Sequence, residues 1–175
     1  MTKKLKRSQI SLRTLEAISH VPGRRICLSP RGRRFDQAFA KELAHEPGVV
    51  LVCGRYEGID QRVIEAREME EVSLGDFVLT GGEIAAQALL DATVRLLPGV
   101  IGSEQGLDEE SFEDGLLEYP QYTHPKIWKG RSVPEVLLSG NHKKIAEWKK
   151  QQSELVTRNH RPDLWEAYEG VKVQI

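Results

Sequence analysis

The segment VVLVCGRYEGID, Val49 to Asp60, joins a short apolar run to a glycine-rich polar loop. A second segment with a glycine-rich loop, SLGDFVLTGGE, follows at Ser73 to Glu83. In α/β proteins, small molecules bind at the carboxyl ends of strands, where loops and helix N-termini offer backbone hydrogen-bonding groups. Both segments therefore predict strand ends that open into ligand-binding loops.

The N-terminal part of the chain alternates strand-like and helical patterns, which predicts an α/β fold with a mostly parallel sheet. Strands are expected at Arg25–Leu28, Val49–Cys53, Glu71–Leu74 and Phe77–Leu79. Helices are expected at Ser8–Ile18, Phe35–Leu43, Ile59–Glu68 and Glu83–Leu97. The intervening LSPRGR, Leu28 to Arg33, is expected to be a polar loop.

The composition changes beyond Gly102, where an acidic loop precedes EYPQYTHP, Glu118 to Pro125, a segment without regular periodicity. Asn141 is expected to cap a helix on which Ile145, Trp148 and Leu155 share one face, before a short terminal helix. We therefore expect an α/β domain over residues 1–102, an acidic loop and interdomain linker over 103–134, and a small helical domain over 135–175.

Charge is distributed unevenly along the 175 residues, although the formal net charge is only -1. Met1 to Phe35 carries ten Lys or Arg and one acid, Glu57 to Glu118 carries sixteen acids and three bases, and Tyr119 to Ile175 carries ten bases and six acids. The basic ends could bind a polyanion such as RNA. The alternative is an ordinary solvated surface.

Neither cysteine chemistry nor a membrane span is expected. Cys27 and Cys53 lie in apolar runs without metal-ligand spacing, which favours a buried structural role over a disulfide or a metal site. No apolar run approaches the roughly 18 residues of a membrane helix, and the charged N-terminus leads into no secretory core. We expect a cytoplasmic protein.

Several motifs occur together in an order that resembles the bacterial tRNA (guanine-N1)-methyltransferases, members of the SPOUT superfamily. They are LSPRGR, LVCGRYEGID, SLGDFVLTGGE, EESFEDGLLEYPQYTHP and VPEVLLSGNH, and the resemblance covers about Arg25 to Leu164. It implies a deep trefoil knot, bound S-adenosyl-L-methionine, and a homodimer with the active site at the subunit interface. It also implies methyl transfer to N1 of the guanine immediately 3′ of the anticodon in tRNA.

The resemblance places two catalytic groups. Guanine N1 must lose a proton as it attacks the methyl group, and charge develops on the neighbouring carbonyl oxygen, so a base and a cationic donor are required. Glu110 stands where the family has an aspartate base, and Arg95 stands where the family has an arginine near the guanine. Asp108 or Glu109 could replace Glu110, whose side chain is one methylene longer than aspartate. The alternative for Arg95 is a surface pair with Asp91.

The resemblance also implies two sets of binding residues. The S-adenosyl-L-methionine set is Leu28, Ser29, Pro30, Gly54, Tyr56, Glu57, Ser73, Leu74, Gly75, Leu79, Gly81 and Gly82. Glu57 could instead pair with Arg55 or Arg62. The tRNA set is Lys143, Lys144, Lys149, Lys150, Arg158 and Arg161. Magnesium is compatible with the family, but no acidic spacing assigns it to residues, so no metal ligands are predicted.

Two other interpretations follow from the sequence. The family's usual N-terminal strand and glycine-rich segment are not found before Leu28, so the chain is expected to be N-terminally shortened. Together with Glu110, this suggests a catalytically silent homologue that binds tRNA or the cofactor. A nucleotide-cofactor oxidoreductase is excluded, because neither glycine-rich loop has the Gly-x-Gly-x-x-Gly spacing.

Overall fold

The computed structural model describes residues 22–55, 58–101 and 110–173. The chain divides into two compact units, Met1–Gly102 and Ser103–Ile175. The expected helix at Ser8–Ile18 lies outside the described residues, as do Tyr56, Glu57, Asp108 and Glu109.

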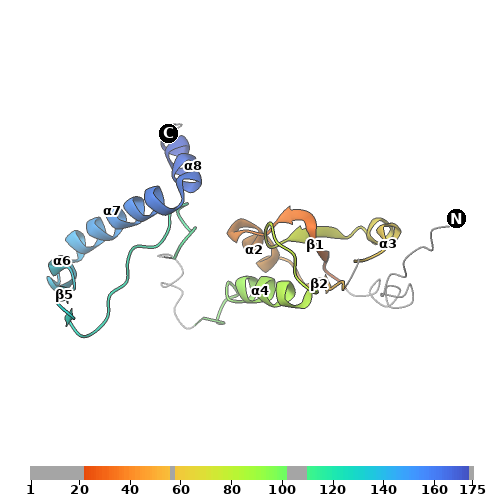
Figure 1. Ribbon diagram of the computed structural model, residues 1–175, viewed down its shortest axis with the longest axis horizontal. Coiled ribbons are helices and arrows are strands. Elements are labelled where there is room, and N and C mark those ends of the chain that lie inside the picture. Colours follow the sequence, from red (N-terminus) through yellow and green to blue (C-terminus); the bar gives the residue numbers. More distant parts are fainter. Residues whose placement is uncertain (1–21, 56–57, 102–109, 174–175) are drawn as a thin grey trace. The chain divides into compact units, whose positions relative to one another are not determined.

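The described part of the first unit, drawn in red to green in Figure 1, contains a three-stranded parallel sheet in the order β2-β1-β3. Its strands are β1 (Arg24–Arg34), β2 (Val49–Val52) and β3 (Glu70–Ser73), and its helices are α2 (Gln37–Ala44), α3 (Gln61–Ala66) and α4 (Glu83–Val94). Three of the four predicted strands are confirmed, and so is the parallel arrangement. The predicted strand at Phe77–Leu79 is wrong, since that segment forms bends and irregular loop.

The predicted polar loop at Leu28 to Arg33 is wrong in part, because β1 continues through it. Leu28 and Arg33 both pair with Val72, so the residues between them bulge out of the ladder. A Cβ atom on Gly32 would lie 2.1 Å from the carbonyl carbon of Glu71. Only glycine allows the returning chain to approach β3 this closely, and so the strand resumes after a polar bulge.

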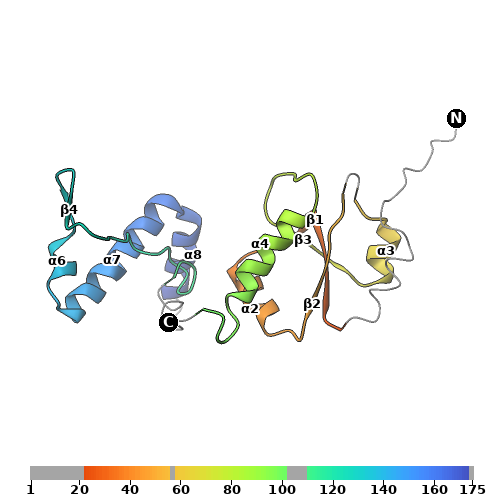
Figure 2. The same cartoon turned by 90° about the horizontal axis from the view of Figure 1, so that it is seen from below.

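Alternate residues of β1 contact two separate apolar clusters, one on each face of the sheet. Ile26 packs with Phe39 and Leu43 of α2, Val72 of β3 and Leu89 of α4. Figure 2 shows α2 and α4 on one side of the strands and α3 on the other. Because helices cover both faces of the sheet, the ends of its strands are held in fixed positions. The loops that follow the strands therefore start from fixed points.

The cluster on the α3 face contains Cys27 of β1, with Val52, Val63, Ile64 and Met69. Both cysteines are free thiols, and Cys27 is only 3% exposed. The predicted structural role of Cys27 is therefore supported by its position in the core. Burial and the charge of Glu71 raise the pKa of its thiol to about 11.

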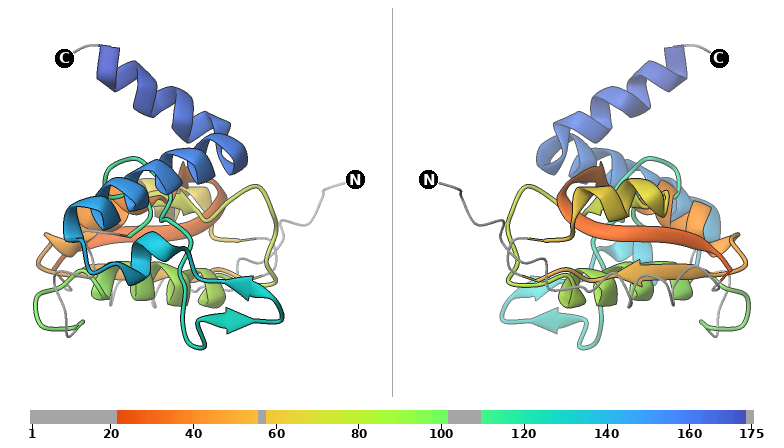
Figure 3. Two further views of the ribbon diagram at one scale, coloured as in Figure 1. Left: turned by 90° about the vertical axis from the view of Figure 1, so that its left-hand side faces the viewer. Right: turned by 90° about the vertical axis from the view of Figure 1, so that its right-hand side faces the viewer.

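The described part of the second unit is built around one long helix. Its elements are β4 (Ile127–Trp128), β5 (Arg131–Ser132), α6 (Glu135–Leu138), α7 (His142–His160) and α8 (Pro162–Val173). The predicted cap is confirmed, because the Asn141 side chain accepts a hydrogen bond from the Lys144 N–H at 3.1 Å. The antiparallel hairpin of β4 and β5 was not predicted. Figure 3 shows that it projects away from α7 and α8.

An irregular segment before the hairpin packs along α7. The rings of Tyr119 and Tyr122 lie 6.4 and 6.2 Å from that of Trp148. Near the C-terminal end of α7, the fully buried Thr157 accepts a hydrogen bond from the Leu117 N–H. Leu155 is 48% exposed, although its spacing placed it on the apolar face, because the contact with the irregular segment is made through Thr157, roughly 200° further round the helix.

Candidate ligand-binding site

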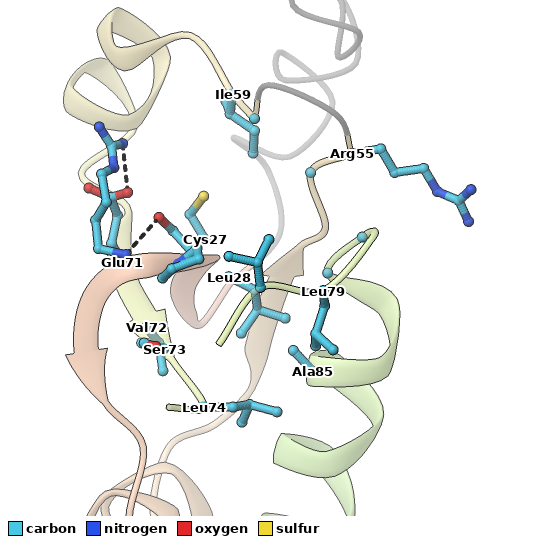
Figure 4. A pocket seen from close by; sticks show the side chains of 18 of the residues that line it. Cys27, Leu28, Arg55, Ile59, Glu71, Val72, Ser73, Leu74, Leu79 and Ala85 are labelled. Atoms are coloured by element: carbon cyan, nitrogen blue, oxygen red, sulfur yellow. Dashed lines mark hydrogen bonds and ion pairs between the residues drawn. The ribbon is translucent and has the colours of Figure 1, made fainter. Parts of the chain in front are cut away.

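The first unit contains a cavity of about 430 Å³ at the carboxyl ends of β2 and β3, beside the bulge of β1 (Figure 4). Four parts of the chain form its walls: the β1 bulge, the loop after β2 with the start of α3, the loop after β3, and the first turn of α4. This is the edge of the sheet at which the two glycine-rich segments were expected to open. The described residues that line the cavity are Cys27, Leu28, Ser29, Pro30, Arg31, Gly54, Arg55, Gly58, Ile59, Gln61, Ile64, Glu71, Val72, Ser73, Leu74, Gly75, Phe77, Val78, Leu79, Thr80, Gly81, Gly82 and Ala85.

The loops after β2 and β3 are joined by backbone contacts between their glycines. The Gly82 N–H donates to the Gly54 carbonyl at 3.0 Å, and Arg55 forms an isolated antiparallel bridge with Gly81. A Cβ atom on Gly82 would lie 3.0 Å from the Cα atom of Cys53. The glycine at this position therefore permits the two loops to meet beside the cavity, at the start of α4.

The loop after β3 begins with a tight turn around a buried serine. The Ser73 hydroxyl donates to the Gly75 carbonyl at 3.0 Å and accepts from the Gly75 N–H at 3.2 Å. Gly75 has a φ of +159°, at the edge of the region that favours glycine. The turn brings Leu74 and Leu79 to the cavity wall, and Figure 4 shows Leu79 close to Leu28 and Ala85. These side chains form an apolar surface of the kind that lines small-molecule sites.

The charged groups at the cavity are paired with one another. Arg31 donates to Glu71 at 2.8 Å and to Gln61 at 3.2 Å, across the bulge. Arg55 donates to Glu83 at 2.6 Å and lowers the pKa of that carboxyl, and its side chain points away from the cavity in Figure 4. The site therefore offers apolar walls and backbone hydrogen-bonding groups, which suit binding better than proton transfer.

The ten described residues of the predicted cofactor set all line this cavity. The structure brings together residues that are up to 54 positions apart in the chain, from Leu28 to Gly82. Their contact with S-adenosyl-L-methionine stays a prediction. The hydrogen-bonded group of Arg31, Gln61 and Glu71 was not predicted. The sequence features that could have indicated it are an arginine in the polar LSPRGR segment and an acid at the start of the predicted third strand.

The two predicted catalytic residues lie outside the lining of this cavity. Arg95 is half-buried and follows the last residue of α4, whereas the cavity is at the first turn of that helix. Ala85 is the last residue of α4 that lines the cavity, and the rise of an α-helix, 1.5 Å per residue, puts about 15 Å between its backbone and that of Arg95. Glu110 is half-buried in the second unit, where its carbonyl accepts a hydrogen bond from the Glu113 N–H.

The six predicted tRNA contacts fall into two groups on α7 and at its end. Three have partners within the second unit: Lys149 lies 4.7 Å from the Tyr119 ring centre, Arg158 lies 4.6 Å from the Trp165 ring centre, and Arg161 donates two hydrogen bonds to Asp163.

The other three, Lys143, Lys144 and Lys150, are exposed on α7. At 100° per residue, Lys143 and Lys150 differ by only about 20° around the axis, and the exposed Glu147 lies within about 60° of both, so the face they share carries both signs of charge. Their contact with tRNA phosphates stays a prediction.

Neither a metal centre nor a membrane span is found in the described ranges. No group of three or more His, Cys, Asp or Glu side chains in residues 22–55, 58–101 and 110–173 could hold a metal ion. Over the same residues, no helix combines the length and the apolar character needed to cross a bilayer.

Comparison with known proteins gives one consistent result. The family model described as tRNA (Guanine-1)-methyltransferase TrmD matches residues 4–167. A tRNA (guanine-N(1)-)-methyltransferase from Ruegeria pomeroyi is 62% identical over 147 residues, which cover 84% of this chain and 60% of the relative. Proteins with the same name from Bartonella tribocorum and Rhodospirillum rubrum are each 57% identical, over 87% and 86% of this chain and 67% and 63% of the relatives. The chain thus spans about 60 to 67% of the length of these relatives.

Proposed function

The chain belongs to the tRNA (guanine-1)-methyltransferase family, and on that premise we propose that it methylates tRNA at N1 of the guanine immediately 3′ of the anticodon. The methyl donor in this proposal is S-adenosyl-L-methionine. The observation that carries the proposal is the cavity, because the loops predicted to hold the donor form one continuous wall at the carboxyl ends of the strands. A tRNA substrate also implies a cytoplasmic location. Family membership is the support for a trefoil knot in the chain path.

The cavity fits the donor in size and in chemistry. Its volume of about 430 Å³ lies in the range of small-molecule sites, roughly 300–1,000 Å³. The apolar side chains of Leu28, Leu74 and Leu79 would hold the adenine. Backbone groups of Gly54 and Gly81 that are not used in the hydrogen bond between Gly82 and Gly54 would bind its polar edges and the ribose. Gly82 is buried and packs closely on Cys53, so its part in this proposal is to let the two loops meet beside the cavity. When bound, the donor supplies a methyl group on a sulfonium, which is open to in-line displacement.

Two residues of the chain are proposed to act on the guanine. Glu110 would accept the N1 proton, and Arg95 would donate hydrogen bonds to the carbonyl oxygen as negative charge develops there. A guanidinium suits this second role because it stays protonated and offers several donors in a fixed plane. The cavity itself provides binding, alignment and exclusion of water.

We also propose a homodimer in which two copies share each site. Arg95 follows the end of α4, about 15 Å along the helix from Ala85 at the cavity of its own chain, so a second copy is the proposed source of the Arg95 that acts at each site. The outer face of α4 supports this, because Ile84, Leu90 and Val94 are exposed apolar side chains on it. Gln87 and Asp91 are exposed between them, so the face is mixed, and its apolar side chains are the part that an obligate interface would bury.

Mixing two inactive variants would test the shared site. Arg95→Ala keeps the cavity, and Leu79→Trp fills the cavity but keeps Arg95. If sites are shared, hybrid dimers contain one intact site, so an equal mixture should recover about a quarter of the wild-type activity. If each site is built within one chain, the mixture should stay as inactive as its components. Sedimentation of each variant provides the control that both still dimerise.

The methyl-transfer reaction itself is the primary test. We would incubate the full chain with labelled S-adenosyl-L-methionine and unmodified tRNA, with and without magnesium, and identify the product nucleoside by mass. Formation of 1-methylguanosine supports the proposal. Absence of product, with the donor still bound in equilibrium dialysis, would refute it in favour of the catalytically silent homologue.

Variants of Glu110 and Arg95 test their assigned roles. Glu110→Ala and Arg95→Ala should bind the donor normally and lose turnover by about two to four orders of magnitude, the effect of removing an acid–base or charge-stabilising group. Glu110→Asp should keep most of the turnover because it keeps the carboxylate. Asp114→Ala, an exposed acid in the same loop, is the matched control and should behave like the wild type. Near-normal turnover in both alanine variants would contradict the assignment.

A further inference from the structure

The β4–β5 hairpin of the second unit is short, well formed and exposed. Ile127 pairs with Ser132, Trp128 pairs with Arg131, and the Val133 N–H donates to the Lys126 carbonyl at 2.9 Å. The two turn residues, Lys129 and Gly130, have φ values of +48° and +76°. Positive φ at both turn positions is the geometry of a two-residue hairpin turn that matches the twist of the strands. The hairpin therefore presents its side chains on a defined backbone.

The two faces of the hairpin differ in chemistry. Neighbouring residues of a strand point to opposite faces, and directly opposed residues of paired strands point to the same face. Trp128 and Arg131 therefore share one face, and Ile127 and Ser132 share the other. The Lys129 ammonium lies 5.1 Å from the centre of the Trp128 ring, so a second cation belongs to the tryptophan face.

Trp128 differs from the other tryptophans of the chain in its exposure. Its side chain is 57% exposed, and the Lys129 ammonium lies over its ring. Trp148, by contrast, packs against Tyr119 and Tyr122, and Trp165 packs against Tyr168. A large aromatic ring held out in solvent on a rigid turn has one face available to a planar partner.

The charge around this ring is positive. Lys126, Lys129 and Arg131 lie within six residues of one another, and the sequence has no acid between Glu118 and Glu135. Within the residues that the structure describes, neither Lys126 nor Arg131 is within ion-pair distance of a carboxylate. An aromatic ring flanked by cations matches a nucleic acid strand, whose bases stack on aromatic rings while its phosphates bind Lys and Arg.

We propose that the β4–β5 hairpin is an RNA-binding element on which an unpaired base of the substrate stacks against Trp128, with Arg131 and Lys126 contacting the adjacent phosphates. The base must be unpaired, because bases inside a duplex already have both faces stacked and offer no surface to a side chain. This inference rests on the proposed tRNA substrate. It adds an interaction separate from the lysines of α7, which would bind phosphates alone.

Binding of unmodified tRNA to the full chain would test whether the hairpin contacts RNA. We would measure the equilibrium affinity by fluorescence anisotropy at several salt concentrations. Trp128→Ala should weaken binding by about 5- to 100-fold at each salt concentration, with little change in the salt dependence, because stacking is not ionic. Trp128→Phe should keep most of the affinity, since a phenyl ring still stacks. Arg131→Ala should weaken binding and reduce the slope of log K against log salt by about 0.7, the value expected for one fewer neutralised phosphate on a single strand.

Ile127→Ala is the matched control. Ile127 is 66% exposed in the same strand but lies on the opposite face, so its removal should change RNA affinity by less than about twofold. Equal affinities of Trp128→Ala and Ile127→Ala would overturn the inference. So would a change in self-association of Trp128→Ala, measured by sedimentation, with RNA affinity unaltered, because the ring would then contact protein.

The binding assay separates this inference from the proposed function. If the wild type binds tRNA through Trp128 but forms no 1-methylguanosine, the proposed function fails and the hairpin assignment stands. If methylation proceeds and binding does not depend on Trp128, the hairpin assignment fails alone.

Discussion

Replacing Thr157 with valine would remove one hydroxyl group from the second unit at almost constant volume. The Thr157 side chain is fully buried in α7, and its Oγ1 atom accepts from the Leu117 N–H at 2.8 Å and donates to the Ser153 carbonyl at 2.7 Å. The first of these bonds ties the irregular segment before the hairpin to the helix. The segment that it holds begins close to Glu110, so the same bond supports the loop that carries the proposed base.

The replacement removes two hydrogen bonds, and each has its own cost in the free energy of unfolding. Loss of the acceptor leaves the half-buried Leu117 N–H without its partner, which costs about 1–3 kcal/mol. The Ser153 carbonyl loses less, because a carbonyl accepts two bonds and the helix still supplies one, from the Thr157 N–H. We therefore expect Thr157→Val to lower the free energy of unfolding by about 2 kcal/mol.

Thr157→Ser provides the matched control, since it keeps the hydroxyl and removes only a buried methyl group, worth about 0.8 kcal/mol. The serine variant should then be more stable than the valine variant by roughly 1 kcal/mol. For a unit of this size that difference corresponds to about 4–8 °C in melting temperature. If packing of the methyl group were what holds the segment, the order would be reversed.

Thermal unfolding of the full chain, followed by circular dichroism, gives the order of the two variants. Hydrogen exchange at the Leu117 amide gives a local measurement, because this amide should exchange faster in Thr157→Val and stay protected in Thr157→Ser. A serine variant that melts at or below the valine variant, or a Leu117 amide that stays protected in both, would refute the reasoning.

The remaining predictions concern two glycines and a cysteine. Gly32→Ala should lower stability by about 3 kcal/mol in chemical denaturation, because its Cβ atom would lie 2.1 Å from the Glu71 carbonyl carbon. At Gly170 in α8, an added Cβ atom would meet no neighbouring group within 4 Å, so Gly170→Ala should instead raise stability by about 0.5–1 kcal/mol. Similar effects of the two substitutions would contradict this reasoning. Burial raises the pKa of Cys27 from 9.0 to about 11, so the folded protein disfavours the thiolate and should lose stability as the pH rises from about 9 to about 11. Denaturation at pH 8 and pH 11 measures this loss, which should be much smaller in Cys27→Ala.

The elements with strong local signals could be predicted from the sequence. The helix at α7 has a capping asparagine and an apolar stripe, and the strand at β2 is a continuous apolar run, so both were predicted close to their observed bounds. The hairpin was missed because its strands are two residues long and exposed, which leaves no alternation of apolar and polar residues to detect. Its remaining signal was the Lys129-Gly130 turn, which is weaker than Asn-Gly.

Two errors in the first unit have a common cause. The segment at Leu28 to Arg33 is polar and contains Pro30, a pattern that predicts a loop, yet β1 resumes after a bulge and pairs again with Val72. The segment at Phe77–Leu79 is apolar, a pattern that predicts a strand, yet its apolar side chains line the cavity. In both, tertiary packing outweighed the local pattern, through pairing with β3 residues 39 positions away in the first segment and through placement beside the cavity in the second.

The amino-acid sequence by itself determined the α/β class, the parallel sheet and the two glycine-rich loops, because hydrophobic periodicity and glycine placement are local properties that any fold must satisfy. It also carried the motifs through which the family was recognised. Only the tertiary structure decided that the loops meet around one cavity, that Arg95 lies about 15 Å along α4 from it, and that Trp128 and Arg131 share an exposed face. These are relations between distant residues, and they depend on how strands pair and helices pack, which no local pattern encodes.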